Sequence, residues 1–363
     1  MTDRSRTTRL LLLSAYRADS HAAWSDWLTA AFADVHWQTL ELPGRNFRWR
    51  IRGNPLSWLD ALDPLTADAL VATSMVDLAT LRGLHPALAR LPTLYYFHEN
   101  QFAYPLGAHQ ARSIEPQMVQ LYGALAADRL GFNSRFNLES FLDGVQRLLR
   151  RMPDAVPARV PERLAAKAEV LPVPVRPPAP AEAPRDPRLV LWNHRWEYDK
   201  APELFAEALL ALADRGVSFR LALLGARPEQ PPAPLVRLRE QLGGRIVADG
   251  KVARPQYAAL LRRAGIVVST ALHEFQGLAM LEAVSAGAVP LVPDDLVYPE
   301  QYPPACRYPA RDGAALAQRL QSWLEGTPPP APDVRAWTEA ALAGQWRSAL
   351  AALTGDSPDS RSR

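Results

Sequence analysis

The sequence has little cysteine and little lysine. Its 363 residues include one cysteine, Cys306, which excludes a disulfide framework and a cysteine-based metal site. Of the 41 basic residues only Lys167, Lys200 and Lys251 are lysine, so 38 are arginine. Codon usage in a GC-rich genome explains such an excess, and so would a surface built to bind phosphate or RNA through the guanidinium fork. On composition alone, codon usage is the favoured explanation of the arginine excess.

Long hydrophobic runs are also missing. No stretch approaches the roughly 20 apolar residues of a membrane span, and the run Leu10–Leu13 is too short for the core of a signal peptide. The net charge of +3 is too small to indicate nucleic-acid binding by itself. With 48% hydrophobic and 22% charged residues, the composition is that of a globular protein. We therefore expect a cytoplasmic protein without stable membrane insertion.

The order of apolar runs and helix-period segments predicts an α/β fold with doubly wound parallel sheets. The length predicts about two domains, and a run of prolines that excludes helix and central strand divides the chain near its middle. We expect an N-terminal domain over 1–171, a linker over 172–187, a C-terminal domain over 188–330, a helix over 331–354 and a disordered tail over 355–363. Ligands of such sheets bind beyond the carboxyl ends of the strands, which here predicts a cleft between two domains.

One helical segment, residues 136–151, has apolar residues on a single face and arginines at its end. This pattern predicts a helix whose apolar face packs into the core and whose cations suit the helix dipole. A helix lying on a membrane surface is the alternative.

Two strand-to-helix connections in the second half carry polar residues. Glu274 lies in a loop after a buried-type strand, and Glu282 lies eight positions on, among apolar residues where a lone carboxylate needs a partner. Gly277, at the expected helix start, allows close approach of a ligand to backbone amides that bind anions. Arg195 and Lys200 flank another helix entrance, where cations oppose the dipole. They either bind a diphosphate or pair with neighbouring carboxylates at the surface.

Two segments of the first half are candidates for substrate contact. His98 directly follows an apolar strand and opens the polar run His98–Gln101. This density of polar residues favours a binding loop, with a hydrogen-bonded core histidine as the alternative. It is not a zinc signature, because no second ligand has metal spacing. In the segment 45–52 aromatic and aliphatic residues alternate with arginines. On an extended strand this places rings on one face and cations on the other, as in proteins that bind single-stranded RNA. An edge strand with solvated arginines is the alternative.

These segments together resemble a known enzyme family. Glu274 and Glu282 with seven residues between them, the Arg195 and Lys200 pair, and Gly250-Lys251-Val252 resemble the family-4 retaining glycosyltransferases of the GT-B fold. His-Glu-Asn-Gln at 98–101 with Tyr104-Pro105, the segments 132–142 and 194–200, and Leu296-Val-Tyr-Pro-Glu resemble the tRNA-queuosine α-mannosyltransferase branch. The chain departs from the wider family in reading Glu274-Phe-Gln-Gly where many members read Glu-Gly-Phe-Gly.

The resemblance implies two Rossmann-like domains and a sugar-nucleotide donor, expected to be GDP-mannose, with no metal and no tightly bound cofactor. It implies a tRNA anticodon stem-loop carrying queuosine as acceptor, and a front-face attack in which the leaving phosphate takes the acceptor proton. The implied catalytic residues are His98, Arg195, Lys200 and Glu274. The implied donor-binding residues are Asn193, Lys251, Gly277, Leu278 and Glu282. The implied acceptor or RNA contacts are Arg45, Arg48, Trp49, Arg50, Glu99, Asn100, Gln101 and Arg135.

Two other functions compete with this one. A glycosyltransferase of the same fold could act on a lipid, a polysaccharide or a small molecule, and a lipid acceptor would need an exposed apolar face on residues 136–151. A non-catalytic RNA-binding protein could also use the same scaffold, and Lys200 and Glu274 would then be dispensable.

Overall fold

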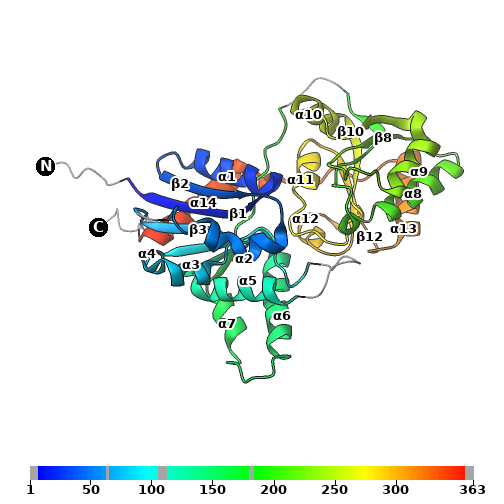
Figure 1. Ribbon diagram of the computed structural model, residues 1–363. Helices are drawn as coiled ribbons and strands as arrows, with labels where there is room; N and C mark the ends of the chain where they lie inside the picture. Colours follow the sequence, from blue (N-terminus) through cyan, green and yellow to red (C-terminus); the bar gives the residue numbers. More distant parts are fainter. Residues whose placement is uncertain (1–6, 63–64, 105–112, 180–183, 356–363) are drawn as a thin grey trace. The chain divides into compact units, whose positions relative to one another are not determined.

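The chain forms two compact units of α/β structure. The computed structural model describes residues 7–62, 65–104, 113–179 and 184–355 (Figure 1). Unit 1 comprises Met1–Val173 together with Leu342–Arg363, and unit 2 comprises Pro174–Ala341. Residues 356–363 of the expected tail, and 180–183 of the expected linker, lie outside the described residues.

Unit 1 contains a six-stranded parallel sheet in the order β2-β1-β3-β4-β5-β6. Its central strands are buried on both faces, which is why they read as continuous apolar runs in the sequence. The strands are β1 (Arg9–Arg17), β2 (His36–Pro43), β3 (Ala69–Thr73), β4 (Thr93–Phe97), β5 (Arg129–Phe132) and β6 (Ala168–Val170). The helices are α1 (Asp19–Ala31), α2 (Phe47–Ser57), α3 (Leu78–Leu84), α4 (Pro86–Ala89), α5 (Glu115–Ala126), α6 (Arg135–Leu149), α7 (Val160–Ala165) and α14 (Glu339–Thr354). The doubly wound α/β prediction is confirmed.

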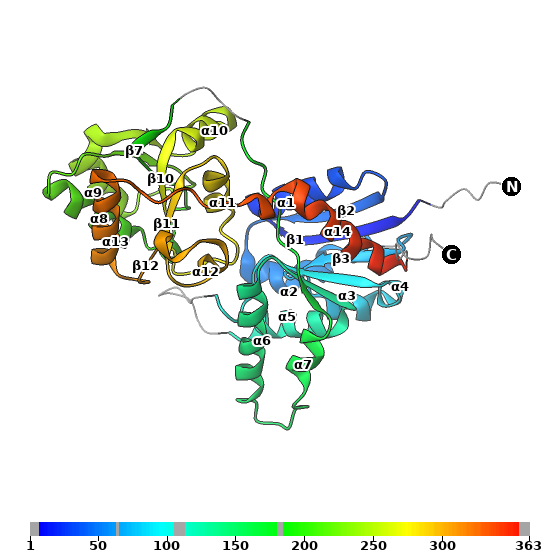
Figure 2. The same cartoon turned by 180° about the vertical axis from the view of Figure 1, so that it is seen from behind.

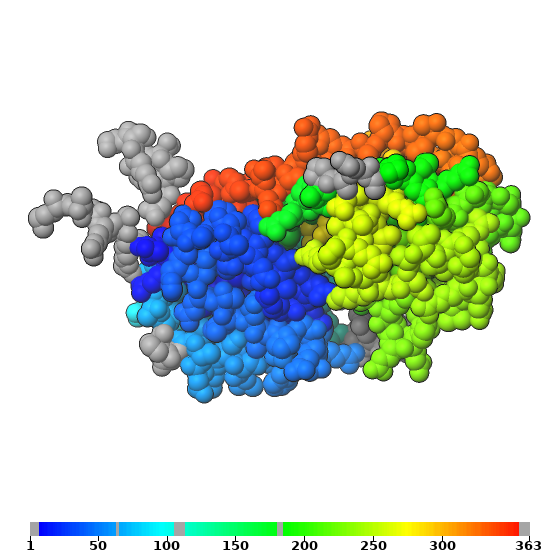
Figure 3. All heavy atoms as spheres, turned by 90° about the horizontal axis from the view of Figure 1, so that it is seen from above, coloured from blue at the N-terminus to red at the C-terminus, as the bar shows by residue number. Residues whose placement is uncertain are grey.

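The last helix of the chain packs on the N-terminal unit. Trp346 of α14 is fully buried against Trp24 of α1 and Tyr96 of β4, at ring-centroid distances of 5.8 and 5.0 Å. Its indole N–H donates to the Pro172 carbonyl over 2.9 Å. Figures 2 and 3 show α14 beside α1 at this face of the sheet. The first and last parts of the described chain therefore share one hydrophobic face.

The helix expected at 136–151 is present as α6. Phe141, Val145 and Leu148 are buried in the core on the other face of the sheet, and Leu138 and Leu142 pack against that core partly buried. The apolar face of α6 is thus covered by unit 1 itself. The membrane interpretation and the lipid acceptor both require this face of 136–151 to be exposed, so helix α6 supports neither.

The extended strand expected at 45–52 is wrong, because the segment from Phe47 is helix α2. Phe47, Ile51 and Pro55 are spaced by four residues and turn inward, with Ile51 2% exposed. Asn54 stabilises the helix inside the unit, since its side-chain amide donates to the Arg50 and Met75 carbonyls over 2.7 and 3.1 Å. The apolar residues of so short a segment fit both the two-residue repeat of a strand and the 3.6-residue repeat of a helix. Packing inside unit 1 selects the helix.

Unit 2 contains a second six-stranded parallel sheet, in the order β12-β11-β10-β7-β8-β9. Helices α8, α9 and α13 pack together on one side of it, and α10 and α11 lie on the other (Figure 1). The strands are β7 (Asp186–Trp192), β8 (Arg220–Leu223), β9 (Ile246–Asp249), β10 (Ala264–Val268), β11 (Val289–Pro293) and β12 (Arg307–Tyr308). The helices are α8 (Pro202–Asp214), α9 (Ala233–Leu242), α10 (Arg254–Arg263), α11 (Leu278–Ser285), α12 (Tyr298–Gln301) and α13 (Gly313–Glu325), with 3-10 turns η1 (Tyr198–Lys200), η2 (Gly243–Arg245), η3 (Pro304–Cys306) and η4 (Arg335–Trp337).

Candidate active site

The strand order of unit 2 creates a site at the middle of its sheet. From β7 the chain moves outward through β8 to β9, then returns to pair β10 with the other edge of β7. The connections leaving β7 and β10 therefore diverge to opposite sides, and ligands of doubly wound sheets bind beyond the carboxyl ends at such a point. The residues that follow these strands are Asn193 and His194 after β7, and Ser269 and Thr270 after β10.

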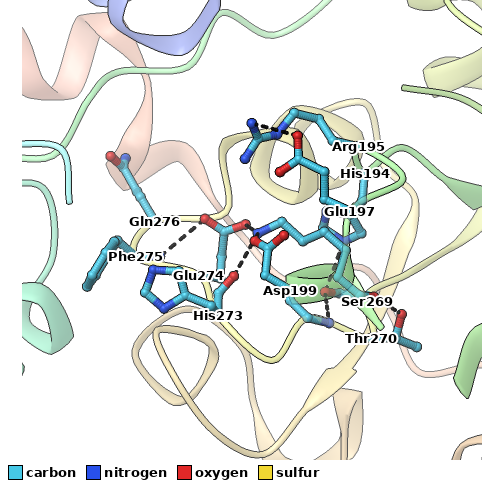
Figure 4. Close-up of polar contacts among 12 residues, drawn as sticks. His194, Arg195, Glu197, Asp199, Ser269, Thr270, His273, Glu274, Phe275 and Gln276 are labelled. Carbon is cyan, nitrogen blue, oxygen red and sulfur yellow. Dashed lines mark hydrogen bonds and ion pairs between the residues drawn. The ribbon is translucent and has the colours of Figure 1, made fainter. Parts of the chain in front are cut away.

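A buried lysine lies at this point. The ammonium of Lys200, at the end of the turn η1, is 3.2 Å from Glu274 Oε2 and 3.2 Å from Asp199 Oδ2. It also donates to the His273 carbonyl over 2.6 Å. An ammonium has three donors, and here each has an acceptor. Figure 4 shows the carboxylates of Asp199 and Glu274 close together, with the backbone carbonyl of His273 facing the same point.

The charges in the cluster stabilise one another. Burial favours the neutral acid of Glu274, but Lys200, His194 and the Gly277 amide outweigh it and lower the pKa of Glu274 to about 2. Burial likewise opposes the charge on Lys200, and the carboxylates of Glu274 and Asp199 outweigh it, so the pKa of Lys200 is raised. The cluster therefore contains one cation and an ionised Glu274 at neutral pH.

Two neutral histidines adjoin the charged cluster. Burial, reinforced by the neighbouring Lys200, lowers the pKa of both His194 and His273 to about 4. His194 Nε2 is 2.9 Å from Ser269 Oγ, which is 2.7 Å from the hydroxyl of Tyr298. This chain of hydrogen bonds ties the loop after β7 to the loop after β10 and to α12.

The second carboxylate, Glu282 of α11, has the partner that its apolar surroundings require. The hydroxyl of Tyr257, on α10, donates to Glu282 Oε2 over 2.9 Å and accepts from the Asn193 side-chain amide over 3.2 Å. Burial raises the pKa of Glu282, against the effect of the Tyr257 hydrogen bond and Arg254. Asn193 also donates to the Ala279 carbonyl over 2.8 Å. These contacts hold Glu282 beside the first turn of α11.

The start of α11 requires a glycine. Gly277 is the N-cap residue and has φ 66°, a left-handed conformation that glycine adopts without strain. Leu278 begins the helix directly after it. Phe275 N donates to Glu274 Oε1 over 3.2 Å, so the loop between Glu274 and Gly277 is held by the carboxylate itself.

The two remaining predicted residues of unit 2 are at its surface. The side chain of Arg195 is 53% exposed, and its guanidinium lies 3.2 Å from the Glu197 carboxylate (Figure 4). Lys251 is exposed in the loop after β9. The structure thus brings Asn193, Lys200, Glu274, Gly277 and Glu282 to one end of the sheet, with Arg195 at its exposed edge.

In unit 1 the loop after β4 carries the polar run that begins at His98. The His98 ring is 8% exposed and packs against His21 and Trp24, at centroid distances of 4.1 and 4.7 Å. Burial, with His21 nearby, lowers the pKa of His98 well below the usual value. His98 is thus a neutral imidazole whose Nε2 is buried without a hydrogen-bond partner.

The other residues of that polar run differ in exposure: one is buried and stabilises the loop, and the others are partly exposed. Asn100 is fully buried, and its amide donates to Asn137 Oδ1 and Ser140 Oγ, each over 2.9 Å, while its oxygen accepts from the Phe102 and Ala103 amides. Asn100 therefore positions the loop and does not present its side chain to an acceptor. Glu99 and Gln101 are partly exposed and bond each other over 3.3 Å, and Arg135 is exposed at the start of α6.

Sequence reasoning missed three residues of the unit 2 site. Asp199 is one of the neighbouring carboxylates of the surface-pairing alternative, but it is 2% exposed, and only the packing of η1 shows that it pairs with Lys200 inside the unit. Tyr257 lies 25 residues before Glu282, and no local pattern connects them. His194 lies inside a motif already noted, and its place directly after β7 was the available signal.

Among the ranges given above, no group of three or more His, Cys, Asp or Glu residues is arranged to hold a metal ion. Within the same ranges, no helix has both the length and the hydropathy needed to cross a membrane.

The fold matches known glycosyltransferase structures. Sucrose-phosphate synthase from Thermosynechococcus elongatus superposes with a TM-score of 0.70 at 16% identity, over 96% of this chain and 100% of that one. The Anabaena HepE protein in complex with UDP and glucose superposes with a TM-score of 0.62 at 14% identity, over 98% and 99% of the two chains. At these identities the likeness shows the fold alone. The fold is that of the GT-B class.

The family follows from sequence comparison. Residues 9–175 match the family described as tRNA-queuosine alpha-mannosyltransferase N-terminal, and residues 187–325 match glycosyl transferases group 1. The tRNA-queuosine alpha-mannosyltransferase of Drosophila melanogaster is 34% identical over 327 residues, covering 86% of each chain. The chain belongs to the tRNA-queuosine alpha-mannosyltransferase family.

Proposed function

We propose that this protein transfers mannose, with retention, from GDP-mannose to the cyclopentenediol of queuosine in a tRNA anticodon. The observation that carries the proposal is the charged cluster around Lys200 beyond the carboxyl ends of β7 and β10, in a chain 34% identical to a relative named tRNA-queuosine alpha-mannosyltransferase. A cytoplasmic location agrees with a tRNA acceptor. The transfer proposed here uses no metal.

When the donor binds, one of the acceptors that now contact the Lys200 ammonium would be replaced by a diphosphate oxygen. Its three donors already have acceptors, and the contact to Glu274 at 3.2 Å is longer than the one to the His273 carbonyl at 2.6 Å. A diphosphate oxygen would replace the Glu274 oxygen, because phosphate carries more charge and Asp199 stays in place. Glu274 would then turn to the hydroxyls of the hexose. Arg195 would leave Glu197 and close on the diphosphate from the exposed edge, and Lys251 would add a cation after β9.

The proposed reaction breaks the bond between the hexose C1 and the diphosphate oxygen. An acceptor hydroxyl attacks C1 from the same face, and its proton passes to the leaving diphosphate oxygen. Negative charge gathers on the diphosphate in the transition state, where Lys200 and Arg195 would stabilise it electrostatically. His98, neutral and with an unpartnered nitrogen, would contribute a hydrogen bond to the sugar.

The Tyr257 hydroxyl would position Glu282 for the ribose of the donor. It occupies Oε2, which leaves Oε1 as the acceptor for a ribose hydroxyl. Tyr257→Phe should raise the KM for the sugar nucleotide about 5- to 10-fold with little change in kcat, because one hydrogen bond of about 1 kcal/mol is lost. It should also raise the pKa of Glu282 further, since that hydrogen bond opposes the effect of burial.

The measurement is kcat and KM for the donor as a function of pH. The acid limb of kcat/KM should move to higher pH in Tyr257→Phe. Glu282→Gln is the matched variant, and its donor KM should not depend on pH in that limb. An unchanged pH profile in Tyr257→Phe would mean that the hydroxyl only packs.

On the acceptor side, we propose Glu99, Gln101 and Arg135 as contacts from the loop after β4 and the start of α6. Arg45, Arg48, Trp49 and Arg50 would add contacts from α2 and the loop before it. Asn100 would act through the loop that it holds.

The test is incubation of the protein with queuosine-containing tRNA and a panel of sugar nucleotides, followed by mass analysis of the wobble nucleoside. We expect one added hexose with GDP-mannose and none with tRNA that lacks queuosine. No added hexose on queuosine with any donor would overturn the proposal. Binding of tRNA without transfer would favour the non-catalytic RNA-binding function, and transfer to another acceptor would favour the wider glycosyltransferase function.

A further inference from the structure

The exposed face of helix α2 combines a large aromatic ring with unbalanced positive charge. Over residues 44–59 the chain has four arginines and no acidic residue, whereas the whole protein has a net charge of only +3. Trp49 is 56% exposed on this face, although large aromatic rings are usually buried. Such a surface is complementary to a ligand with both a flat apolar group and negative charge.

The Trp49 ring lies against helix α2 at Gly53, where the absence of a side chain leaves room for it. A Cβ added at Gly53, one turn on, would lie 2.4 Å from Cε2 of the indole and 2.7 Å from Cδ2. The Cα–Cβ bond of a helical residue points toward the preceding turn, so any larger residue at 53 would push the ring away. Glycine destabilises a helix interior, and its presence here leaves one face of the indole on the helix and the other in solvent.

Some of the neighbouring residues are exposed and could contact a ligand, whereas others already contact other residues of unit 1. Arg45 and Arg48 are exposed beside Trp49. The guanidinium of Arg52 is paired with Asp77 at 2.5 Å. Phe47 packs against Tyr16 at a centroid distance of 6.3 Å. Arg50 is half-buried, and its Nε is buried without a hydrogen-bond partner. One exposed ring and two exposed cations therefore remain.

We propose that this face of α2 is a platform on which one unpaired nucleobase of the tRNA stacks on Trp49, with Arg45 and Arg48 on the flanking phosphates. The inference rests on the proposed function, which supplies tRNA as the acceptor. Base-aromatic stacking tolerates any base, because every base has a π face. The platform therefore contributes affinity for a loop, while queuosine is selected elsewhere.

The first test measures binding of an anticodon stem-loop RNA by fluorescence anisotropy. Trp49→Leu should weaken binding about 5- to 150-fold, and Trp49→Phe should weaken it less. Gly53→Ala should weaken binding in the same direction while leaving thermal stability intact, because alanine favours helix. Adding Gly53→Ala to Trp49→Leu should cause no further loss, since both act on the same ring.

A fully paired RNA duplex of equal length is the matched ligand. It offers the phosphates but no free base, so Trp49→Leu should leave its binding unchanged, whereas Arg48→Ala should lower the salt dependence of binding to either RNA by about one charge. Arg215→Ala, at an exposed position in unit 2, should change neither. Equal losses on stem-loop and duplex, or a Gly53→Ala protein that binds normally, would overturn the platform. The platform would also be overturned if the Trp49→Leu protein changed its self-association but bound RNA normally.

Failure of the platform and failure of the proposed function give different results. If mannosyl transfer to tRNA occurs and Trp49→Leu keeps the wild-type kcat/KM for tRNA, the platform is wrong and the function stands. If no hexose is transferred, yet stem-loop binding depends on Trp49 and Gly53, the platform stands and the function is wrong.

Discussion

Lys200→Met is expected to lower kcat for glycosyl transfer about 10²- to 10³-fold, the usual effect of removing one group that stabilises a developing anion. Methionine keeps most of the length of the side chain and removes the charge. The leaving diphosphate would then face Asp199 and Glu274 with no buried cation between them. Binding of tRNA, which depends on unit 1 in our proposal, should be unchanged.

The measurement is single-turnover transfer at saturating donor, beside tRNA binding by the same protein. Lys251→Met is the matched variant, because this second lysine of unit 2 is exposed. It should raise the donor KM and leave kcat within a few-fold. Transfer by Lys200→Met at the wild-type rate would reject a catalytic role for the cluster.

Loss of folding must be separated from loss of chemistry at this position. Removing one partner from a buried ion pair costs about 3 to 5 kcal/mol, and Lys200→Met leaves two carboxylates in the cluster without their cation. The double variant Lys200→Met with Asp199→Asn removes one of those charges. It should recover part of the lost free energy of unfolding and none of the activity. Recovery of both would show that Lys200 acts only in folding.

Acid is expected to destabilise unit 2 at pH values where Glu274 is still ionised. His194 and His273 have pKa values of about 4 in the folded protein, against about 6.5 in an unfolded chain. Between these values the unfolded chain binds one more proton at each histidine, so stability is full above pH 6.5 and falls as the pH drops toward 4. Each histidine should cost about 3 kcal/mol over this window. Glu274, with a pKa of about 2, adds a further loss only below about pH 4.5.

The measurement is the free energy of unfolding in urea at a series of pH values from 7 to 4.5. Between pH 6.5 and 4.5 the slope of the unfolding free energy against pH should correspond to an uptake of about two protons by unit 2 on unfolding. His98 in unit 1 changes this slope in the same direction. His273→Asn and His194→Asn should each remove about one proton from the slope. If both variants keep the wild-type slope, these histidines are not held neutral by the fold.

Much of the fold could be predicted because the signals are local. The continuous apolar strands, such as β10 and β11, are buried on both faces, and burial of that kind leaves a direct trace in composition. Helix α6 was predictable for the same reason, since its apolar face packs within one unit. Helix α2 was not, because its arginines alternate with rings while its inward residues are spaced by four. Only contacts with the rest of unit 1 choose between those periods.

The sequence by itself determined the α/β class, the family, and the kinds of side chain that follow the strands. In a chain with three lysines, one at a strand end was already a reason to single out Lys200. The tertiary structure decided which of these side chains meet. Lys200 pairs with Glu274 because β10 returns to pair with β7, and Tyr257 of α10 bonds Glu282 of α11. Such contacts depend on strand order, which no local pattern encodes, and burial then turns ordinary acids and histidines into groups with shifted pKa values.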